Sequence, residues 1–427
     1  MNTPSFDRRP CILKLINPVQ QYAWGNTDGI APFIDIPPIG GMPAGEVWMS
    51  THRRAPSKVL LAEAETGLDA LIEQDPAFWL GPEAAREFGD LPFLFKVLAA
   101  GAPLSLQVHP DRTAAQTGHA EEEARGIPLL APERTFKDPN HKPELAVALT
   151  PFSAMAGFRP IEEIKSLLGP ELCALAGVDS LPDGAEAFRE LVRRLFNVPQ
   201  EAREKRQSAI ARRAGELSAS SQTRERQAGR LVLELIERYP GDPGQCAPLV
   251  LDILELEPGQ GLFIPAGVIH AYLKGSILEI MACSDNVVRA GLTVKHVDVD
   301  LLCRILDPEA KPLCINAEPA GDDAPGMRHL VWHTPTREFR LERFVLEGEE
   351  SRASQACWKP EGPEILLCTR GEAQIHADSS YALRARSSLF IAGTCPRLTL
   401  QGRAEVWRAA VGFEQSASKS PEKGPAP

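Results

Sequence analysis

The alternation of β-type and helical sequence restricts the fold more than any other feature of the chain. Short apolar runs punctuated by proline and glycine fill residues 10–158, and such runs predict strands of a sandwich or barrel. Residues 161–238 are instead rich in Glu, Arg, Ala and Leu, with apolar residues at the spacing of amphipathic helices. Strand signals resume at residue 248, after a Pro/Gly breaker at 239–244. The chain is therefore predicted to be mainly β with an α-helical insertion.

Individual segments can be assigned within this outline. Short helices are expected near 69–74 and 111–126, and a last β-rich segment is expected from about 328 to 413. The tail from residue 416 is rich in Ser, Lys and Pro, so we expect it to be disordered. Strands are expected at 59–61, 93–98, 144–149 and 248–256.

A strand followed by a tight turn precedes one histidine. An apolar run enters a Pro-Ala-Gly turn at residues 259–267, and His270 follows on the return strand. An imidazole held just past a rigid turn has the fixed position that a metal ligand needs. A similar run and turn recur at 388–393 without a histidine. We infer two related β-barrels, of which only the first carries a metal.

Composition excludes several classes of function. The net charge is −11 and no basic cluster is interleaved with aromatic residues, so nucleic-acid binding is not expected. No run of about 18 apolar residues is present, and the N-terminal segment lacks the apolar core of a signal peptide. We therefore expect a cytoplasmic protein that does not bind membranes. The nine cysteines include no Cys-x-x-Cys pair, which favours free thiols.

Four residues offer donors suited to a metal ion. Gln107 and His109 are two apart on a strand pattern, so both side chains are expected on one face. Glu144 opens another strand, and His270 can join the set if the helical block is an insertion. One amide, two imidazoles and one carboxylate suit zinc with positions left open. Iron, manganese or cobalt also fit this donor set.

The motifs around these donors resemble a known family. The turn and His270 match the second cupin motif, with lysine at 274 where that motif often has asparagine. More specifically, the chain resembles type I mannose-6-phosphate isomerases (phosphomannose isomerases) of the cupin superfamily. The matching blocks stand in family order at 22–25, 45–49, 94–98, 105–111, 141–144, 152–160, 239–242, 265–275 and 285–293.

The resemblance implies a fold with two cupin-like (jelly-roll) β-barrels plus a helical domain. It also implies one zinc ion per chain, held by Gln107, His109, Glu144 and His270, and a sugar phosphate as substrate. We expect a monomer. The implied division is a catalytic cupin domain at 1–152 and 246–320, a helical insertion at 153–245, a metal-free cupin-like domain at 321–415 and a disordered tail at 416–427.

The implied reaction interconverts mannose 6-phosphate and fructose 6-phosphate through an enediol, which links glycolysis to mannose and GDP-mannose metabolism. Zinc suits such a reaction as a Lewis acid. Lys142, Glu279 and Asp285 are all candidates for the base. A lysine beside a divalent cation loses its proton more readily, and a carboxylate on a buried strand faces a cavity or a cation. His141 is a candidate for opening the sugar ring, or an ordinary surface histidine.

The phosphate of the substrate requires cations and hydroxyl groups. The resemblance makes Arg289 essential in the substrate site, and its planar guanidinium suits a phosphate or developing charge. Lys96 and Ser105 lie on strand patterns and are candidates for the same task, or simply a barrel-rim lysine and a strand hydroxyl. Tyr272 is two beyond His270, so it points the same way and is expected to line the pocket.

Three other functions are compatible with parts of this sequence. A cupin that only senses sugar phosphates is disfavoured because the ligands, Lys142 and Arg289 are all present. An iron dioxygenase typically uses more histidines and has no need of that lysine and arginine. An isomerase acting on another sugar is not separable by sequence. A second, nucleotide-transferring activity is not expected, because the chain has no Gly-rich nucleotide-binding region.

Overall fold

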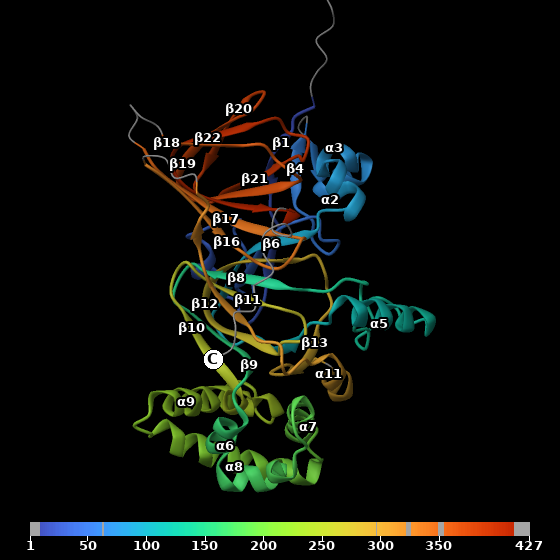
Figure 1. Cartoon of the computed structure of the whole chain (residues 1–427), viewed down its shortest axis with the longest axis vertical. Coiled ribbons are helices and arrows are strands. Elements are labelled where there is room, and N and C mark those ends of the chain that lie inside the picture. Colours follow the sequence, from blue (N-terminus) through green and yellow to red (C-terminus); the bar gives the residue numbers. More distant parts are fainter. Residues whose placement is uncertain (1–8, 62–63, 296, 322–325, 349–353, 414–427) are drawn as a thin grey trace, which may run out of the picture. The chain divides into compact units, whose positions relative to one another are not determined.

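A computed structural model describes residues 9–61, 64–295, 297–321, 326–348 and 354–413, and Figure 1 shows the chain coloured along its sequence. Contacts within the chain divide it into two compact units. Unit 1 comprises residues 1–99, 278–283 and 315–427, and unit 2 comprises 100–277 and 284–314, as far as these are described. The tail at 416–427, expected to be disordered, lies outside the described residues. The domain boundaries expected from the sequence stay a prediction.

The chain is mainly β with inserted helices, as predicted. The sheet of unit 1 does not close on itself over the described residues. Its strand order is β15-β16-β17-β22-β19-β21-β1-β4-β5, with β18 beside β22 and β20 beside β19. Strand β15 has two exposed residues, one of them a proline, and β5 is short and largely exposed. Such strands are poor partners for further pairing, so the ladder ends at both. The sheets remain compatible with a jelly-roll.

Unit 1 contains two long strands that pair with each other. The thirteen-residue strands β19 and β22 pair antiparallel along their length. The buried rings of Trp332 on β16 and Trp407 on β22 stack at 5.2 Å beside them. The strands are β1 (Ile12–Ile16), β2 (Val19–Gln21), β3 (Ala44–Met49), β4 (Lys58–Leu61), β5 (Ala64–Gly67), β6 (Phe93–Ala100), β15 (Glu318–Pro319), β16 (Met327–Trp332), β17 (Arg340–Glu347), β18 (Ser354–Trp358), β19 (Glu364–His376), β20 (Ser380–Arg384), β21 (Ser387–Ile391) and β22 (Leu398–Ala410). The helices are α1 (Thr27–Ile30), α2 (Leu68–Gln74), α3 (Pro76–Leu80) and α4 (Pro82–Glu87).

Unit 2 carries the ligand candidates on neighbouring strands. Five of its strands pair in the order β10-β9-β12-β7-β13, and β8 pairs with β11. The strands are β7 (Leu106–Val108), β8 (Glu144–Ala148), β9 (Phe152–Phe158), β10 (Leu251–Leu256), β11 (Gln260–Ile264), β12 (His270–Ala282) and β13 (Val288–Gly291). Strands β12 and β14 (Leu313–Asn316) continue from unit 2 into unit 1 along the chain.

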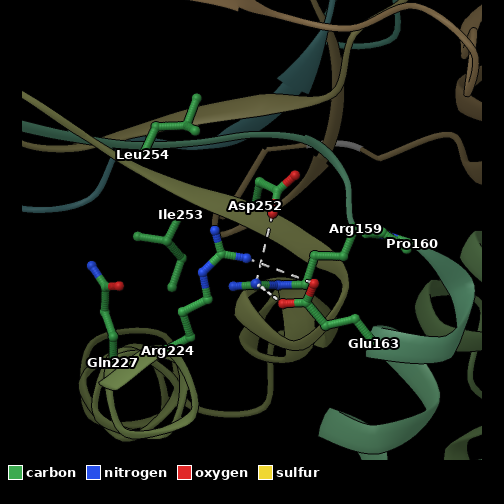
Figure 2. Close-up of a pocket in the computed structure, with 8 residues that line it drawn as sticks. All are labelled: Arg159, Pro160, Glu163, Arg224, Gln227, Asp252, Ile253 and Leu254. Carbon is green, nitrogen blue, oxygen red and sulfur yellow. Dashed lines mark hydrogen bonds and ion pairs between the residues drawn. The ribbon is translucent and has the colours of Figure 1, made fainter. Parts of the chain in front are cut away.

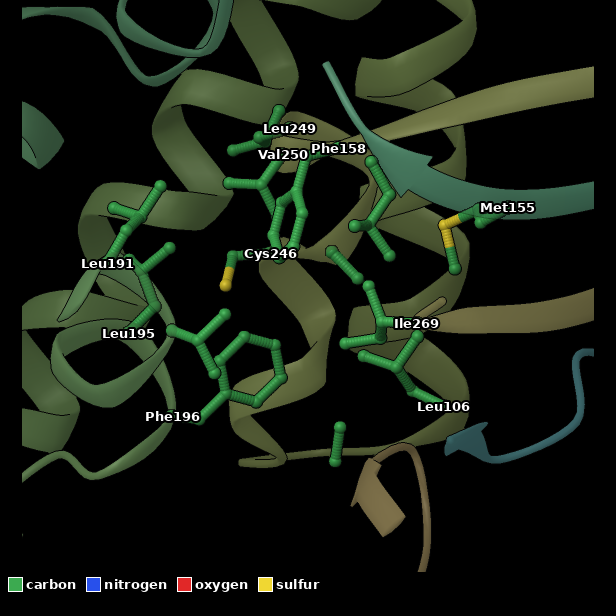
Figure 3. Close-up of a cluster of buried hydrophobic side chains, with 14 of the residues drawn as sticks. Leu106, Met155, Phe158, Leu191, Leu195, Phe196, Cys246, Leu249, Val250 and Ile269 are labelled. Carbon is green, nitrogen blue, oxygen red and sulfur yellow. The ribbon is translucent and has the colours of Figure 1, made fainter. Parts of the chain in front are cut away.

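The predicted helical block is present and packs on the strands of unit 2. Leu191, Leu195 and Phe196 form one buried cluster with Leu106 of β7 and Ile269 at the start of the return strand (Figure 3). The apolar face of the block is thus buried against the sheet that holds the ligands. The helices are α6 (Ile161–Ala176), η1 (Val178–Ser180), α7 (Ala185–Phe196), α8 (Gln200–Ser218), α9 (Thr223–Arg238), η2 (Pro243–Cys246) and α10 (Ala247–Val250).

The remaining helices of unit 2 are α5 (Arg112–Ala124) and α11 (Val299–Ile305). The short helices expected near 69–74 and 111–126 correspond to α2 and α5. No helix among the described residues is long and apolar enough to cross a membrane. None of the nine cysteines, all of which lie among the described residues, is part of a disulfide.

Candidate metal centre and active site

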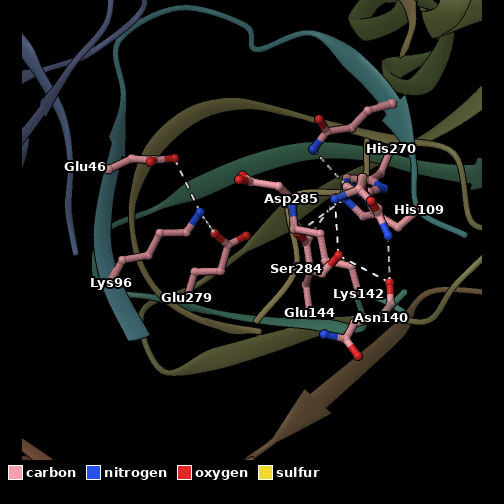
Figure 4. Close-up of polar contacts among 12 residues, drawn as sticks. Glu46, Lys96, His109, Asn140, Lys142, Glu144, His270, Glu279, Ser284 and Asp285 are labelled. Atoms are coloured by element: carbon pink, nitrogen blue, oxygen red, sulfur yellow. Dashed lines mark hydrogen bonds and ion pairs between the residues drawn. The ribbon is translucent and has the colours of Figure 1, made fainter. Parts of the chain in front are cut away.

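Three buried side chains converge in unit 2. His109 follows β7, Glu144 opens β8 and His270 opens β12 (Figure 4). One potential ligand atom from each lies within 4.8 Å of the others, and each residue is 1 % exposed. Two imidazoles and a carboxylate brought together away from water form a donor set that suits zinc.

The Pro-Ala-Gly turn positions two of these ligands at once. Gly267 has a φ of +83°, a conformation that side-chain-bearing residues rarely adopt. Its N–H donates to the carbonyl oxygen of His109 at 2.9 Å, and its carbonyl accepts from the N–H of Asp307 at 3.0 Å. The turn that delivers His270 to its strand therefore also holds the backbone of His109.

The hydrogen bonds of the two imidazoles fix which nitrogen faces the centre. Nδ1 of His109 lies 2.8 Å from the carbonyl oxygen of Asn286, and Nδ1 of His270 lies 2.9 Å from that of Val268. A carbonyl can only accept, so each Nδ1 carries a proton. In the neutral imidazole the lone pair then sits on Nε2, which points at Glu144.

Those lone pairs face a carboxylate. The distance from Nε2 of His109 to Oε1 of Glu144 is 3.2 Å, and from Nε2 of His270 to Oε2 it is 3.3 Å. Nε2 of His109 and Oε2 of Glu144 are buried and lack a hydrogen-bond partner among the described residues. Acceptors buried face to face repel one another unless a cation lies between them. The residues present therefore fit a metal ion.

Protonation does not remove the repulsion between these acceptors near neutral pH. Burial, helped by the positive charge of Lys142, lowers the pKa of His109 to about 4. Burial opposes ionisation of Glu144, but Lys142 and His109 outweigh it, so the pKa of Glu144 falls well below its usual value. The centre thus holds a carboxylate and an unprotonated imidazole at neutral pH.

Gln107 completes the predicted ligand set in space. Its Nε2 lies 3.3 Å from Nε2 of His270, and the two residues are opposite each other in the β7–β12 pairing. A half-turn of the amide presents its oxygen to the same place. All four donors predicted from the sequence are therefore neighbours.

Sequence reasoning missed the residue that supports the loop beside this centre. The side chain of Asn286 is buried, and its Nδ2 donates to the carbonyls of Asp138 at 2.7 Å and Asn140 at 2.9 Å. Its Oδ1 accepts from the N–H of Lys137 at 2.8 Å. Because its own carbonyl also accepts from His109, Asn286 connects one ligand to the segment that leads to Glu144. The only sequence signal was its place in the matching block at 285–293.

Strand register places Arg289 on the same face as the ligands. Gln107 pairs with His270 on one side and with Arg289 on the other, so the three side chains point the same way. Burial lowers the pKa of Arg289, which is partly buried. Its guanidinium has no hydrogen bond or ion pair with any described residue, whereas the buried Arg134, Arg159 and Arg408 each form an ion pair.

Other predicted residues of unit 2 lie around the same strands. Lys142 is buried and its Nζ lies 2.9 Å from Oε1 of Glu144. Ser105 directly precedes β7, and the ring of Tyr272 lies 6.1 Å from that of His270. Nε2 of His141 accepts from the guanidinium of Arg112 at 2.9 Å.

Comparisons with known proteins identify the family. Residues 12–161 match the catalytic domain of type I phosphomannose isomerase. The mannose-6-phosphate isomerase of Escherichia coli is 39 % identical over 401 residues, which cover 92 % of this chain and 98 % of that protein. That of Bos taurus is 38 % identical, with 87 % and 91 % covered. The chain belongs to the type I phosphomannose isomerases.

Solved structures of the family agree in fold and metal. A zinc-bound mannose-6-phosphate isomerase has a TM-score of 0.82 and 34 % identity, and the match covers 94 % of this chain and all of that one. A mutant of the phosphomannose isomerase of Salmonella typhimurium has a TM-score of 0.83 with the same coverage. The predictions of an isomerase of this family and of zinc as its cofactor are confirmed.

Two predicted residues of this phosphomannose isomerase lie in unit 1 and form an ion-pair cluster there. Nζ of Lys96 lies 2.5 Å from Oε2 of Glu279 and 3.3 Å from Oε1 of Glu46 (Figure 4). The other carboxylate oxygen of Glu46 accepts from the indole N–H of Trp48 at 2.6 Å. Lys96 is thus held between two buried carboxylates, a pairing that the sequence alone did not indicate.

A cavity of about 380 Å³ elsewhere in unit 2 contains none of the predicted site residues (Figure 2). Its basic residues are already opposed by acidic ones, as shown by Nη1 of Arg159, 2.6 Å from Oε1 of Glu163. This balance of charge offers an anionic sugar phosphate no advantage. The cavity is lined by Arg159, Pro160, Glu163, Arg224, Gln227, Asp252, Ile253 and Leu254.

Proposed function

We propose that the enzyme interconverts D-mannose 6-phosphate and D-fructose 6-phosphate by moving a proton between C2 and C1 through an enediol. The proposal includes one zinc ion per monomeric, cytoplasmic chain. In the cell the reaction connects glycolysis with mannose and GDP-mannose metabolism.

The observation that carries the proposal is the row of His270, Gln107 and Arg289 on one face of three paired strands. A guanidinium without a partner among the described residues, set beside a metal centre, suits a substrate with an anionic end or a developing negative charge. A cupin that only stores a metal has no need of such a cation.

Zinc, when bound, supplies a Lewis acid that polarises the carbonyl and the adjacent hydroxyl of the open-chain sugar. The chain supplies the proton transfers. A base takes the proton from C2 while the carbonyl oxygen gains one, which gives the enediol. A proton is then delivered to C1 while the hydroxyl at C2 loses its proton, which gives the ketose.

Lys142 is proposed as one candidate for the transfer at carbon. It is buried within 2.9 Å of the carboxylate of ligand Glu144. Glu279 is a second candidate, paired with Lys96 at 2.5 Å as Lys142 is paired with Glu144. Asp285 remains a third candidate, with its backbone N–H held by Asp138 at 2.8 Å. His141 is proposed to assist ring opening.

The substrate contacts complete the proposal. Arg289 is proposed to bind the phosphate or the developing enediolate, with Ser105 as a hydroxyl donor and Tyr272 lining the pocket. Lys96 is proposed as a further substrate contact. Its two carboxylate neighbours hold the ammonium in place, although they also offset its charge.

The decisive experiment is a coupled assay for fructose 6-phosphate formed from mannose 6-phosphate. We expect activity in the zinc enzyme, and a fall of kcat/KM by about 10²-fold or more in Arg289→Lys, because a lysine lacks the planar fork. Solvent exchange of deuterium from C2 of labelled substrate separates the bases. Loss of exchange in Lys142→Met with retention in Asp285→Asn supports Lys142, and the reverse result assigns the base to Asp285. A zinc-loaded enzyme that leaves mannose 6-phosphate unchanged would overturn the proposal.

A further inference from the structure

Two cysteines far apart in the sequence have their sulfur atoms side by side in unit 1. The distance from Sγ of Cys11 to Sγ of Cys395 is 2.7 Å. Other thiol hydrogen bonds described in this chain span 3.1 to 3.8 Å, even though their acceptors are smaller oxygen atoms. The two sulfurs are therefore closer than a thiol contact requires, and less than about 1 Å from the roughly 2.05 Å of a disulfide bond.

The backbone holds the two residues in register. Strand β1 pairs antiparallel with β21, with Ile12 opposite Ile391. The ladder continues past both strands, because the N–H of Ala392 donates to the carbonyl of Cys11 at 2.8 Å. The N–H of Cys395 donates to the carbonyl of Ala392 at 2.9 Å, which closes the turn. The approach of the sulfurs thus follows from strand pairing rather than from two mobile side chains.

The turn that carries Cys395 is clamped by helix α3. The N–H of Gly393 donates to the carbonyl of Trp79 at 2.8 Å, and the hydroxyl of Thr394 donates to that of Phe78 at 2.9 Å. A Cβ on Gly393 would lie 2.2 Å from the carbonyl oxygen of Leu80, so only glycine fits there. Cys395 therefore has little freedom to move away from Cys11.

This turn is the second copy of the one that presents the zinc ligand. The run ending at Gly393 resembles the run ending at Gly267, but proline stands at 396 where the first copy has His270. The second copy has the same rigid turn and places a thiol next to the position that corresponds to His270. The proposed isomerisation does not use these two thiols.

We propose that Cys11 and Cys395 are a redox-active pair that forms a reversible disulfide when the enzyme meets a hydroperoxide. The bond would tie strand β1, at the start of the described chain, to the turn after β21. This is a modification site separate from the zinc centre, which lies in unit 2.

The chemistry balances with the peroxide as the sole oxidant. The Cys11 thiolate attacks one oxygen of the hydroperoxide, the O–O bond breaks, and a sulfenic acid and an alcohol or water result. The Cys395 sulfur then attacks the sulfenic sulfur, the S–O bond breaks, and a second water leaves with the thiol proton. Two thiols are oxidised by two electrons and one peroxide is reduced.

Exposure and pKa indicate which cysteine attacks the peroxide and which one then forms the disulfide. Cys11 is partly exposed, whereas Cys395 is 1 % exposed, so an oxidant in solution meets Cys11 first. The hydrogen bond from the Cys395 thiol lowers the pKa of Cys11 against the opposing effect of burial, and the same bond raises the pKa of Cys395. Cys11 is thus the attacking thiol and Cys395 the resolving one.

The disulfide should stabilise the fold because it closes a very long loop. Residues 11 and 395 enclose most of the chain, and the entropy removed from the unfolded chain grows with loop length. We expect the thermal midpoint of unit 1 to rise by about 3 °C or more on oxidation and to return on reduction. Turnover at saturating substrate should change by less than about twofold, since the zinc ligands lie in the other unit.

The test uses the folded zinc enzyme treated with dilute hydrogen peroxide and then an alkylating agent. The expected result is a peptide containing Cys11 linked to one containing Cys395, with the mass of two hydrogen atoms lost and restored by dithiothreitol. Cys11→Ser and Cys395→Ser should abolish both the link and the rise in thermal midpoint. The exposed Cys357→Ser should retain both.

Two outcomes would overturn the proposal. One is oxidation of Cys11 to the sulfinic acid in the folded enzyme while Cys395 remains a free thiol. The other is a link between these cysteines only after denaturation. Because all readouts are thiol chemistry and stability, they do not depend on which sugar phosphate the enzyme isomerises.

Discussion

Nε2 of His109 lies 3.2 Å from Oε1 of Glu144, and both atoms are hydrogen-bond acceptors at neutral pH. This contact is repulsive without a cation, so zinc should contribute directly to stability. We expect removal of zinc by a chelator to lower the thermal midpoint of unit 2. At zinc about 1,000-fold above its dissociation constant, the stabilisation is about 4 kcal/mol. Calorimetry with and without chelator measures the shift, and an unchanged midpoint after verified metal loss contradicts it.

His270→Ala should remove zinc and activity together. The imidazole supplies one of the ligand nitrogens from a buried, carbonyl-bound ring, and no neighbouring side chain can replace it. We expect less than a tenth of the wild-type zinc content by mass spectrometry and a kcat lower by about 10³-fold or more. His119→Ala is the matched control, because that histidine lies partly exposed on α5, 3.8 Å from Glu123. Full zinc content in His270→Ala would remove it from the ligand set.

The part of the site that could be predicted from the sequence is the part encoded locally. The turn before His270 depends on proline and on a glycine with positive φ, and both leave a signal within a few residues. Gln107 lies on β7 as expected, but His109, which was expected on the same strand, directly follows it. The turn and the helical insertion were predicted correctly.

The parts that could not be predicted depend on pairings between distant segments. The carbonyl of Asn286 that fixes the tautomer of His109 is a backbone group and has no residue-type signature. The position of Arg289 beside Gln107 follows from strand register, which a single sequence does not specify. Among the described residues the sheet of unit 1 ends at β5, and where a sheet ends is again a property of the assembled chain.

The metal-free enzyme should lose stability as the pH falls from about 6.5 to about 4. Burial and Lys142 lower the pKa of His109 to about 4, whereas an unfolded histidine titrates near 6.5. In this window the unfolded state binds more protons than the folded state. The free energy of unfolding therefore decreases as the pH is lowered, by up to about 3 kcal/mol. Thermal midpoints of the metal-free wild type and of His109→Gln are compared across this pH range. Their difference isolates the contribution of His109 to the pH dependence of stability. Parallel curves for the two proteins contradict it.

Asn286→Asp should slow the reaction while leaving zinc in place. A carboxylate cannot donate to the carbonyls of Asp138 and Asn140, so the segment that carries His141 and Lys142 loses its support. The carbonyl that accepts from His109 remains. We expect kcat to fall by about 10-fold to 100-fold with zinc content unchanged. Asn197→Asp, at the exposed end of α7, is the control. Loss of zinc in step with kcat would show that Asn286 acts through the metal instead.

Gly267→Ala should disrupt the metal centre through the backbone. The added Cβ would lie 2.6 Å from Cβ of Asp307, and the φ of +83° itself disfavours alanine. Strain of this kind costs about 1–3 kcal/mol, and relief by moving the turn displaces both His270 and the carbonyl of His109. Gly126→Ala separates the two effects, because that glycine has a φ of +66° and open space around it. We expect both variants to unfold at lower temperature, but only Gly267→Ala to bind zinc more weakly, as a competition titration with a chelator measures. Equal zinc affinity in the two variants would show that the turn is not what positions the ligands.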